Sequence, residues 1–199
     1  SDGAGTLLTT ESVLVEPNRN AGVDDAVLRE HLMEILGGKR LLALENGELE
    51  GDDTDGHIDT LARFLSPETI AYVGCEDTRD DHYHPLRRMR EELEAYRTLE
   101  GEPYKLVELP LSPAIYDEEG QRLPATYANF LFVNGALLVP TYGVPTDEVA
   151  LDRLRQALPD RAVVGVDSRA LIYQHGSLHC ATMQFPRGFV NKNKWSDDE

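Results

Sequence analysis

Histidine, cysteine and acidic residues gather in two short segments of this sequence, 52–59 and 174–182. In the first segment His57 and Asp59 are two positions apart, so an extended backbone would point both side chains to the same face. An imidazole beside a carboxylate is a general acid and base suited to neutral pH. A carboxylate can also accept two parallel hydrogen bonds from a planar guanidinium group. The pair therefore fits proton transfer or the binding of a planar cation.

Segment 52–59 also has two interpretations that involve no catalysis. A calcium loop is excluded, because aligning Gly56 with the invariant glycine of an EF-hand places Gly51 at the first ligand position and Ala62 where a bidentate Glu belongs. A hairpin turn with solvated acids stays open, because Asp and Gly are ordinary turn residues.

Cys180 is the candidate nucleophile of the second segment. A lone cysteine is most often a small buried hydrophobe. Cys180, however, comes just after the polar turn expected at Gly176 and Ser177, and an intracellular cysteine with a histidine elsewhere is a candidate nucleophile. An unperturbed thiol is only slightly ionised at neutral pH, so a cationic neighbour or substrate would have to raise the thiolate fraction.

The other histidines give weaker signals. His82 and His84 could be grouped with Cys75 as metal ligands, but their spacing matches no zinc pattern and the acidic surroundings favour a solvated loop. No metal site is therefore expected. For His179 a structural role is expected. The alternative is that it supports a reacting residue without touching the substrate itself.

Composition and charge limit the class of protein. The 199 residues are 41% hydrophobic and 28% charged, as in a folded globular chain. No apolar run approaches the roughly 20 residues of a membrane helix, and no signal peptide is evident. The net charge of −17 disfavours nucleic acid and anionic membranes as partners, and it either attracts a cationic substrate or serves solubility alone. Two cysteines without a CxxC motif favour a reducing, cytoplasmic location.

A strand–helix–strand pattern recurs along the chain and predicts a radially repeated α/β architecture. Asp24 and Thr146 are expected to cap helices, and Asn134-Gly135 is a strong hairpin signal. The expected helices are 24–36, 85–96 and 147–158, and the expected strands are 6–10, 13–15, 40–44, 70–73, 104–109, 130–133, 136–139 and 162–166.

A set of short motifs runs along nearly the whole chain: 5–11 (GTLLTTE), 17–20 (PNRN), 53–59 (DTDGHID), 62–64 (ARF), 127–130 (YANF), 134–135 (NG), 164–167 (VGVD), 179–180 (HC) and Gln184. Each motif is weak by itself. Taken in this order, they resemble the motifs of agmatine deiminases, within the wider group of guanidine-modifying enzymes that includes arginine deiminases, peptidylarginine deiminases and amidinotransferases.

The resemblance implies a pentein-type five-bladed α/β propeller with its active site in the central channel. It implies Cys180 as the nucleophile, His57 as the proton carrier and Asp59 as the carboxylate that grips the guanidinium. The implied reaction converts agmatine to N-carbamoylputrescine and ammonia through a covalent thiouronium intermediate, in putrescine biosynthesis. No metal or organic cofactor is implied. Asp53 and Asp55 would either meet the distal ammonium of agmatine or shape the turn.

Two departures from the family pattern matter. The family's cysteine segment is commonly Gly-rich, and here 174–177 (QHGS) replaces part of that run, which leaves the exact substrate open. The family's second guanidinium-binding Asp and its catalytic Glu belong to segments that would precede Ser1. We therefore expect the C-terminal blades of one catalytic domain, residues 1–190, followed by a polar tail, 191–199. This part by itself should be inactive or poorly folded.

Other functions stay open at this point. An arginine or peptidylarginine deiminase would need a positive partner for a carboxylate, and Arg63 and Arg169 are candidates. A non-catalytic guanidinium-binding fragment is the alternative outside enzymes. The sequence leaves the oligomeric state open, a homo-oligomer included.

Overall fold

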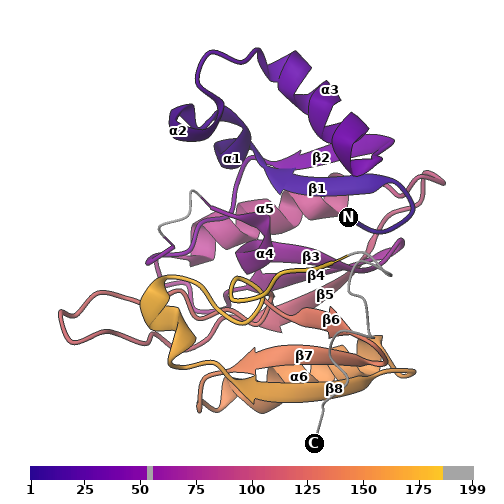
Figure 1. Ribbon diagram of the computed structural model, residues 1–199. Coiled ribbons are helices and arrows are strands. Elements are labelled where there is room, and N and C mark those ends of the chain that lie inside the picture. Colours follow the sequence, from indigo (N-terminus) through magenta and orange to yellow (C-terminus); the bar gives the residue numbers. More distant parts are fainter. Residues whose placement is uncertain (53–55, 186–199) are drawn as a thin grey trace, which may run out of the picture.

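The computed structural model describes residues 1–52 and 56–185. Three small sheets follow one another along the chain, from β1–β2 through β3–β5 to β6–β8 (Figure 1). The strands are β1 (Thr6–Thr10), β2 (Arg40–Leu44), β3 (Ala62–Ser66), β4 (Thr69–Gly74), β5 (Lys105–Pro110), β6 (Leu131–Val133), β7 (Ala136–Thr141) and β8 (Ala162–Asp167). The helices are α1 (Glu11–Val15), α2 (Pro17–Asn20), α3 (Asp25–Leu36), α4 (Ile58–Leu61), α5 (Tyr83–Ala95) and α6 (Thr146–Ala157), with a 3-10 turn η1 (Leu171–Gln174).

The second and third sheets have the same connectivity. An antiparallel pair, β3–β4 or β6–β7, is followed by a helix and by a strand that pairs in parallel with the second member. In the first sheet β1 and β2 are parallel and α3 lies between them in the chain, as a parallel pair requires a crossover. The repeated strand–helix–strand pattern and the mixed α/β class are confirmed. The described residues hold three such sheets, and the five-bladed ring stays a prediction.

Helices α5 and α6 join neighbouring units. Helix α5 contacts β4 of its own sheet and β2 of the preceding one, and α6 contacts β8 and β5 in the same way. The units are thus packed in sequence order, which brings the segments between them close together. In the part of the chain described, no helix is long and apolar enough to cross a membrane.

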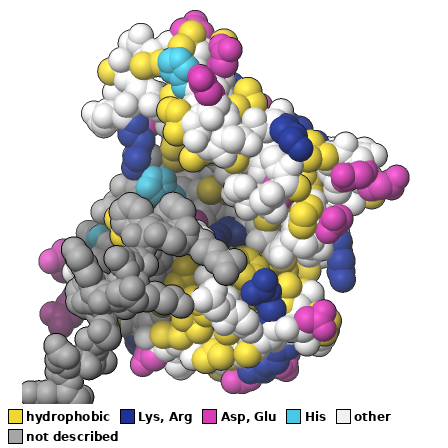
Figure 2. All heavy atoms as spheres, turned by 45° about the vertical axis from the view of Figure 1, so that its right-hand side comes forward, with side chains coloured by type: hydrophobic (Ala, Val, Ile, Leu, Met, Phe, Trp, Pro, Cys, Tyr) yellow, Lys and Arg dark blue, Asp and Glu magenta, His cyan; other side chains and the backbone are white. Residues whose placement is uncertain are grey.

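Helix α3 begins and ends where the sequence predicts. The Asp24 side chain accepts hydrogen bonds from the backbone N–H groups of Ala26 and Val27, and Gly37 ends the helix in the left-handed conformation that glycine adopts without strain. Two apolar side chains at its C-terminal end are nevertheless exposed, Ile35 at 80% and Leu36 at 61%. Figure 2 shows hydrophobic side chains at the surface of this upper part of the molecule.

The strand predicted over 13–15 is wrong, because these residues belong to α1. The Asn20 side chain donates hydrogen bonds to the carbonyls of Val13 and Leu14, which would otherwise be unsatisfied at the end of this short helix. The cap predicted at Thr146 is also wrong, since Thr146 is already the first helical residue of α6. Strand β3 was absent from the expected strands.

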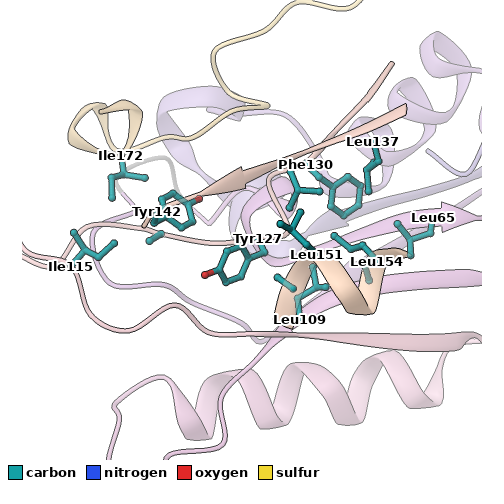
Figure 3. Close-up of a cluster of buried hydrophobic side chains, with 14 of the residues drawn as sticks. Leu65, Leu109, Ile115, Tyr127, Phe130, Leu137, Tyr142, Leu151, Leu154 and Ile172 are labelled. Atoms are coloured by element: carbon teal, nitrogen blue, oxygen red, sulfur yellow. The ribbon is translucent and has the colours of Figure 1, made fainter. Parts of the chain in front are cut away.

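The second sheet (β3–β5) and the third sheet (β6–β8) share one hydrophobic core. Figure 3 shows its side chains, drawn from both sheets, α6 and the segment that precedes β6. Tyr127 and Phe130 of that segment have no exposed surface, and the Tyr127 hydroxyl lies 2.7 Å from both the Thr146 hydroxyl and an Asp147 carboxylate oxygen. Asn129 is therefore held between two anchored aromatic side chains.

Candidate active site

Three segments that connect or follow the sheet units supply the candidate site. Asp59 lies in α4, which ends where β3 begins, Asn129 lies two residues before β6, and Cys180 follows β8 and η1. Backbone and side-chain hydrogen bonds join the segments: the Thr126 hydroxyl donates to the Thr60 carbonyl at 2.7 Å, and the Asn129 side-chain oxygen accepts from the His179 N–H at 2.8 Å. Residues far apart in the chain thus meet at one place.

Asp59 and Cys180 are in direct contact. The Cys180 thiol donates to the Asp59 Oδ2 oxygen over 3.6 Å, and the same oxygen lies 2.6 Å from Nδ1 of His179. The other carboxylate oxygen, Oδ1, is buried and has no hydrogen-bond partner among the described residues. A buried carboxylate oxygen without a donor is costly to maintain, so it is ready to accept an N–H group from a ligand.

The charges around this contact act in opposite directions on its two groups. Burial alone would raise the pKa of Asp59, but the hydrogen bond and charge of His179 and the charge of Arg63 outweigh it and lower that pKa. Partial burial raises the pKa of the Cys180 thiol, and Asp59 adds to this rise. The site therefore pairs an ionised Asp59 with a protonated Cys180.

His57 lies apart from this contact. Its Nε2 atom is 3.0 Å from the guanidinium of Arg19, which can only donate, so Nε2 accepts and the ring proton of a neutral His57 sits on Nδ1. No hydrogen bond joins His57 to Asp59 or Cys180 in the structure. The expected extended geometry is wrong, because the chain turns helical at Ile58, and two residues span about 200° on a helix rather than one face. Asp53 and Asp55 lie outside the described residues.

The loop before Cys180 is tied to the loop before His57. His175 adopts a left-handed backbone conformation with φ of 56°, which glycine adopts more readily than other residues. Its ring Nδ1 lies 2.9 Å from the Gly51 carbonyl. At Gly176 an added Cβ would come within 2.9 Å of the Cys180 Cβ, so this position needs a glycine for the loop to fold back onto the thiol. The His175 contact and the close packing at Gly176 thus fix the loop that carries Cys180.

A buried ionic network holds the other end of the loop that leads to His57. Asp80 accepts two hydrogen bonds from Arg122, at 3.1 and 2.9 Å, and lies 2.6 Å from Nδ1 of His82. The opposite ring nitrogen of His82 accepts from the Glu50 backbone N–H at 2.8 Å. His82 is only 5% exposed, so its predicted place in a solvated loop is wrong. The network thus fixes the loop at Glu50, seven positions before His57.

Replacing Asp80 by Asn should lower the free energy of unfolding by about 2 kcal/mol, because Arg122 would lose its ionic partner while only 10% of its side chain is exposed. Burial alone would raise the pKa of Asp80, but Arg122 and His82 lower it well below its ordinary range. Its stabilisation is therefore complete above the ordinary carboxyl pKa of about 4 and is lost as the pH falls below that value. Urea unfolding between pH 7 and pH 2 measures both effects.

Asp77→Asn is the matched control, because Asp77 pairs with Arg79 at the surface and exposed pairs contribute little. The difference between Asp80→Asn and the natural protein should shrink as the pH approaches 2. A difference that is absent at pH 7, or that grows in acid, would show that Asp80 does not stabilise the fold in this way.

Two groups at the site, Asn129 and His179, have contacts that the sequence does not predict. Asn129 belongs to a noted motif, but an uncharged amide gives no chemical signal of its own. For His179 the sequence favours a structural role over the support of a reacting residue, and its 2.6 Å contact with Asp59 Oδ2 points to the second. Its position next to Cys180 was the available signal.

Asp59, His179 and Arg63 line a hollow of about 600 Å³ beside β1, α4 and β3. The Arg63 guanidinium lies over the Phe130 ring, 4.7 Å from its centre, and donates to the Phe130 carbonyl. Arg169 instead donates to the Tyr142 carbonyl at 2.9 Å. Within the described part of the chain, no three His, Cys, Asp or Glu side chains gather so as to hold a metal ion.

The fold and the site together define an α/β protein of repeated units with a cysteine–carboxylate pair where the units meet. A family model described as Porphyromonas-type peptidyl-arginine deiminase matches residues 1–186. The chain belongs to this family, which confirms the resemblance seen in its motifs.

Individual relatives agree with this assignment. A Vibrio parahaemolyticus protein named "Putative agmatine deiminase" is 35% identical over 202 residues, which cover 94% of this chain and 56% of that protein. The structure titled "Putative Arginine Deiminase" from Porphyromonas gingivalis is 56% identical, with a TM-score of 0.93 over 96% of this chain and 56% of that one. An agmatine deiminase from C. jejuni with substrate bound is 47% identical, with a TM-score of 0.84 over 90% and 52%. This chain thus spans about half the length of the curated relatives it matches.

Proposed function

We propose that the full-length protein containing this chain hydrolyses the guanidinium group of agmatine, with Cys180 as nucleophile. The observation that carries the proposal is the buried, unpartnered Oδ1 of Asp59, whose other oxygen touches the Cys180 thiol. A guanidinium placed on Asp59 would satisfy that oxygen and bring its carbon next to the sulfur. Its positive charge would also favour the thiolate, which burial and Asp59 by themselves disfavour.

The proposed reaction has two halves. The Cys180 thiol gives its proton to His57, and the resulting thiolate attacks the guanidinium carbon and forms a C–S bond. A C–N bond then breaks as ammonia leaves with that proton from His57. The thiouronium intermediate remains on Cys180. Water gives a proton to His57 and attacks the same carbon, the C–S bond breaks, and N-carbamoylputrescine leaves while the thiolate is restored. This is covalent catalysis assisted by one general acid and base.

To act as the proton carrier, His57 must first give up its hydrogen bond with Arg19. Its Nε2 lone pair is occupied by Arg19, so the ring must leave that contact before it can carry a proton to or from the reacting nitrogen. Asp53 and Asp55 precede His57 by a few residues, and we propose that they receive the distal ammonium of agmatine. The product N-carbamoylputrescine would place the protein in putrescine biosynthesis, in the cytoplasm.

Agmatine is favoured over arginine because neither candidate for binding a carboxylate is available. Arg63 is held by the Phe130 ring and carbonyl and faces the charge of Asp59, and Arg169 is held by the Tyr142 carbonyl. Arginine or peptidylarginine is the second candidate, since the similar P. gingivalis structure carries the name of an arginine deiminase.

Ammonia release from agmatine, free arginine and a peptidylarginine tests the proposal in the full-length protein. We expect release from agmatine, lost in Cys180→Ala, and retained in Cys75→Ala, because Cys75 lies outside the site. Release from arginine or its peptide alone would keep the chemistry and reject agmatine. Release from none of the three would reject the deiminase and leave a guanidinium-binding protein.

A further inference from the structure

Asn129 has no exposed surface, and its side chain uses every hydrogen bond that it can readily make. Its Oδ1 oxygen accepts from the backbone N–H groups of His179 and Cys180, at 2.8 and 3.3 Å. Its Nδ2 group donates to the Cys180 sulfur at 3.3 Å and to the Asp59 backbone carbonyl at 3.2 Å. The Asn129 side chain therefore binds both the proposed nucleophile, Cys180, and the backbone of the proposed guanidinium-binding residue, Asp59.

The hydrogen bond from Asn129 Nδ2 to the Cys180 sulfur contributes most to stability when the thiol ionises. The thiol then loses the proton that it shares with Asp59, and two negative groups face each other across what was a 3.6 Å hydrogen bond. The Nδ2 group can still donate to the sulfur, and hydrogen bonding to a charged form favours that form. Asn129 also holds the backbone of Cys180 and Asp59, so repulsion cannot easily separate the two segments.

We propose that Asn129 is a positioning residue, which holds the Cys180 thiolate beside Asp59 at the distance that a guanidinium carbon requires. The role rests on the proposed function, which makes Cys180 the nucleophile. It goes further by assigning the stability of the thiolate to an uncharged amide from a third segment. Because Asn129 lies between the buried Tyr127 and Phe130, the core beneath the site fixes its position.

Asn129→Asp is the sharpest test, because it keeps the size and the Oδ1 acceptor while replacing the donor with an oxygen. The rate of iodoacetamide alkylation of Cys180 is measured from pH 6 to pH 10, in the full-length protein with Cys75 changed to Ser. We expect the alkylation midpoint to rise by about one pH unit or more, which slows the reaction about tenfold at neutral pH. Asn134→Asp, at the exposed tip of the β6–β7 hairpin, is the matched control and should leave the profile unchanged.

A folded Asn129→Asp protein with the natural alkylation profile would overturn the proposal. If this variant does not fold, the side-chain amide protons of Asn129 are followed by NMR in the natural protein. They should shift with the same midpoint as Cys180 alkylation, and resonances that do not move would overturn the proposal as well. Both measurements are made without substrate, so they remain decisive about Asn129 even if no ammonia is released.

Discussion

Replacing Asp59 by Asn should reduce kcat/KM for agmatine about 100-fold or more. Loss of a buried charge that pairs with a ligand costs about 3 kcal/mol, which corresponds to that factor. Asn keeps the size of the side chain, but its amide would direct N–H groups at the guanidinium or at His179, which now lies 2.6 Å from Oδ2. Steady-state ammonia release, measured across pH, reports the change.

Asp160→Asn makes the same chemical change at an exposed position that precedes β8, and it should leave the kinetics unaltered. Circular dichroism of both variants excludes a loss of fold. An Asp59→Asn protein that keeps kcat/KM within about threefold of the natural value would remove Asp59 from the substrate-binding role.

Replacing His57 by Gln should lower kcat by about 10²- to 10⁴-fold, the usual contribution of a positioned proton carrier. The structure makes this a comparison of two histidines, because His179 is nearer to the Asp59–Cys180 contact while His57 is held by Arg19. In our account His57 carries the proton and His179 acts only through Asp59. His179→Gln should therefore affect kcat much less than His57→Gln, as single-turnover rates of both variants would show.

The opposite order would reassign the proton transfer. A large loss in His179→Gln with a small one in His57→Gln would make His179 the general acid and base. His31→Gln, on the exposed face of α3, is the control for a histidine substitution without a role at the site.

Elements marked by strong local signals could be predicted from the sequence. Helix α3 has an Asp cap and a terminal Gly, and the β6–β7 hairpin turns at Asn134-Gly135. Helix α1 could not be predicted this way, because the Val13–Val15 run has the apolar, β-branched character of a strand. Its helical form is supported by Asn20, which binds the carbonyls of Val13 and Leu14 from the following turn.

The site could be predicted only as far as its residues have recognisable chemistry. Cys180 and Asp59 were found as a candidate nucleophile and carboxylate, and the structure places them in contact although 121 positions separate them. Asn129 reaches Asp59 and Cys180 across 70 and 51 positions, and no local pattern encodes such contacts. His82 was misplaced for the same reason, because its ring accepts from the Glu50 backbone N–H, 32 positions away, and its burial depends on that distant loop.

Trapping of the covalent intermediate tests the central claim most directly. The full-length protein is mixed with agmatine and quenched in acid within one turnover, and its peptides are examined by mass spectrometry. We expect the peptide containing Cys180 to gain the mass of agmatine less that of ammonia, and the corresponding Cys180→Ala peptide to gain none. An unmodified Cys180 peptide at every quench time, while ammonia is released at the full rate, would contradict the account.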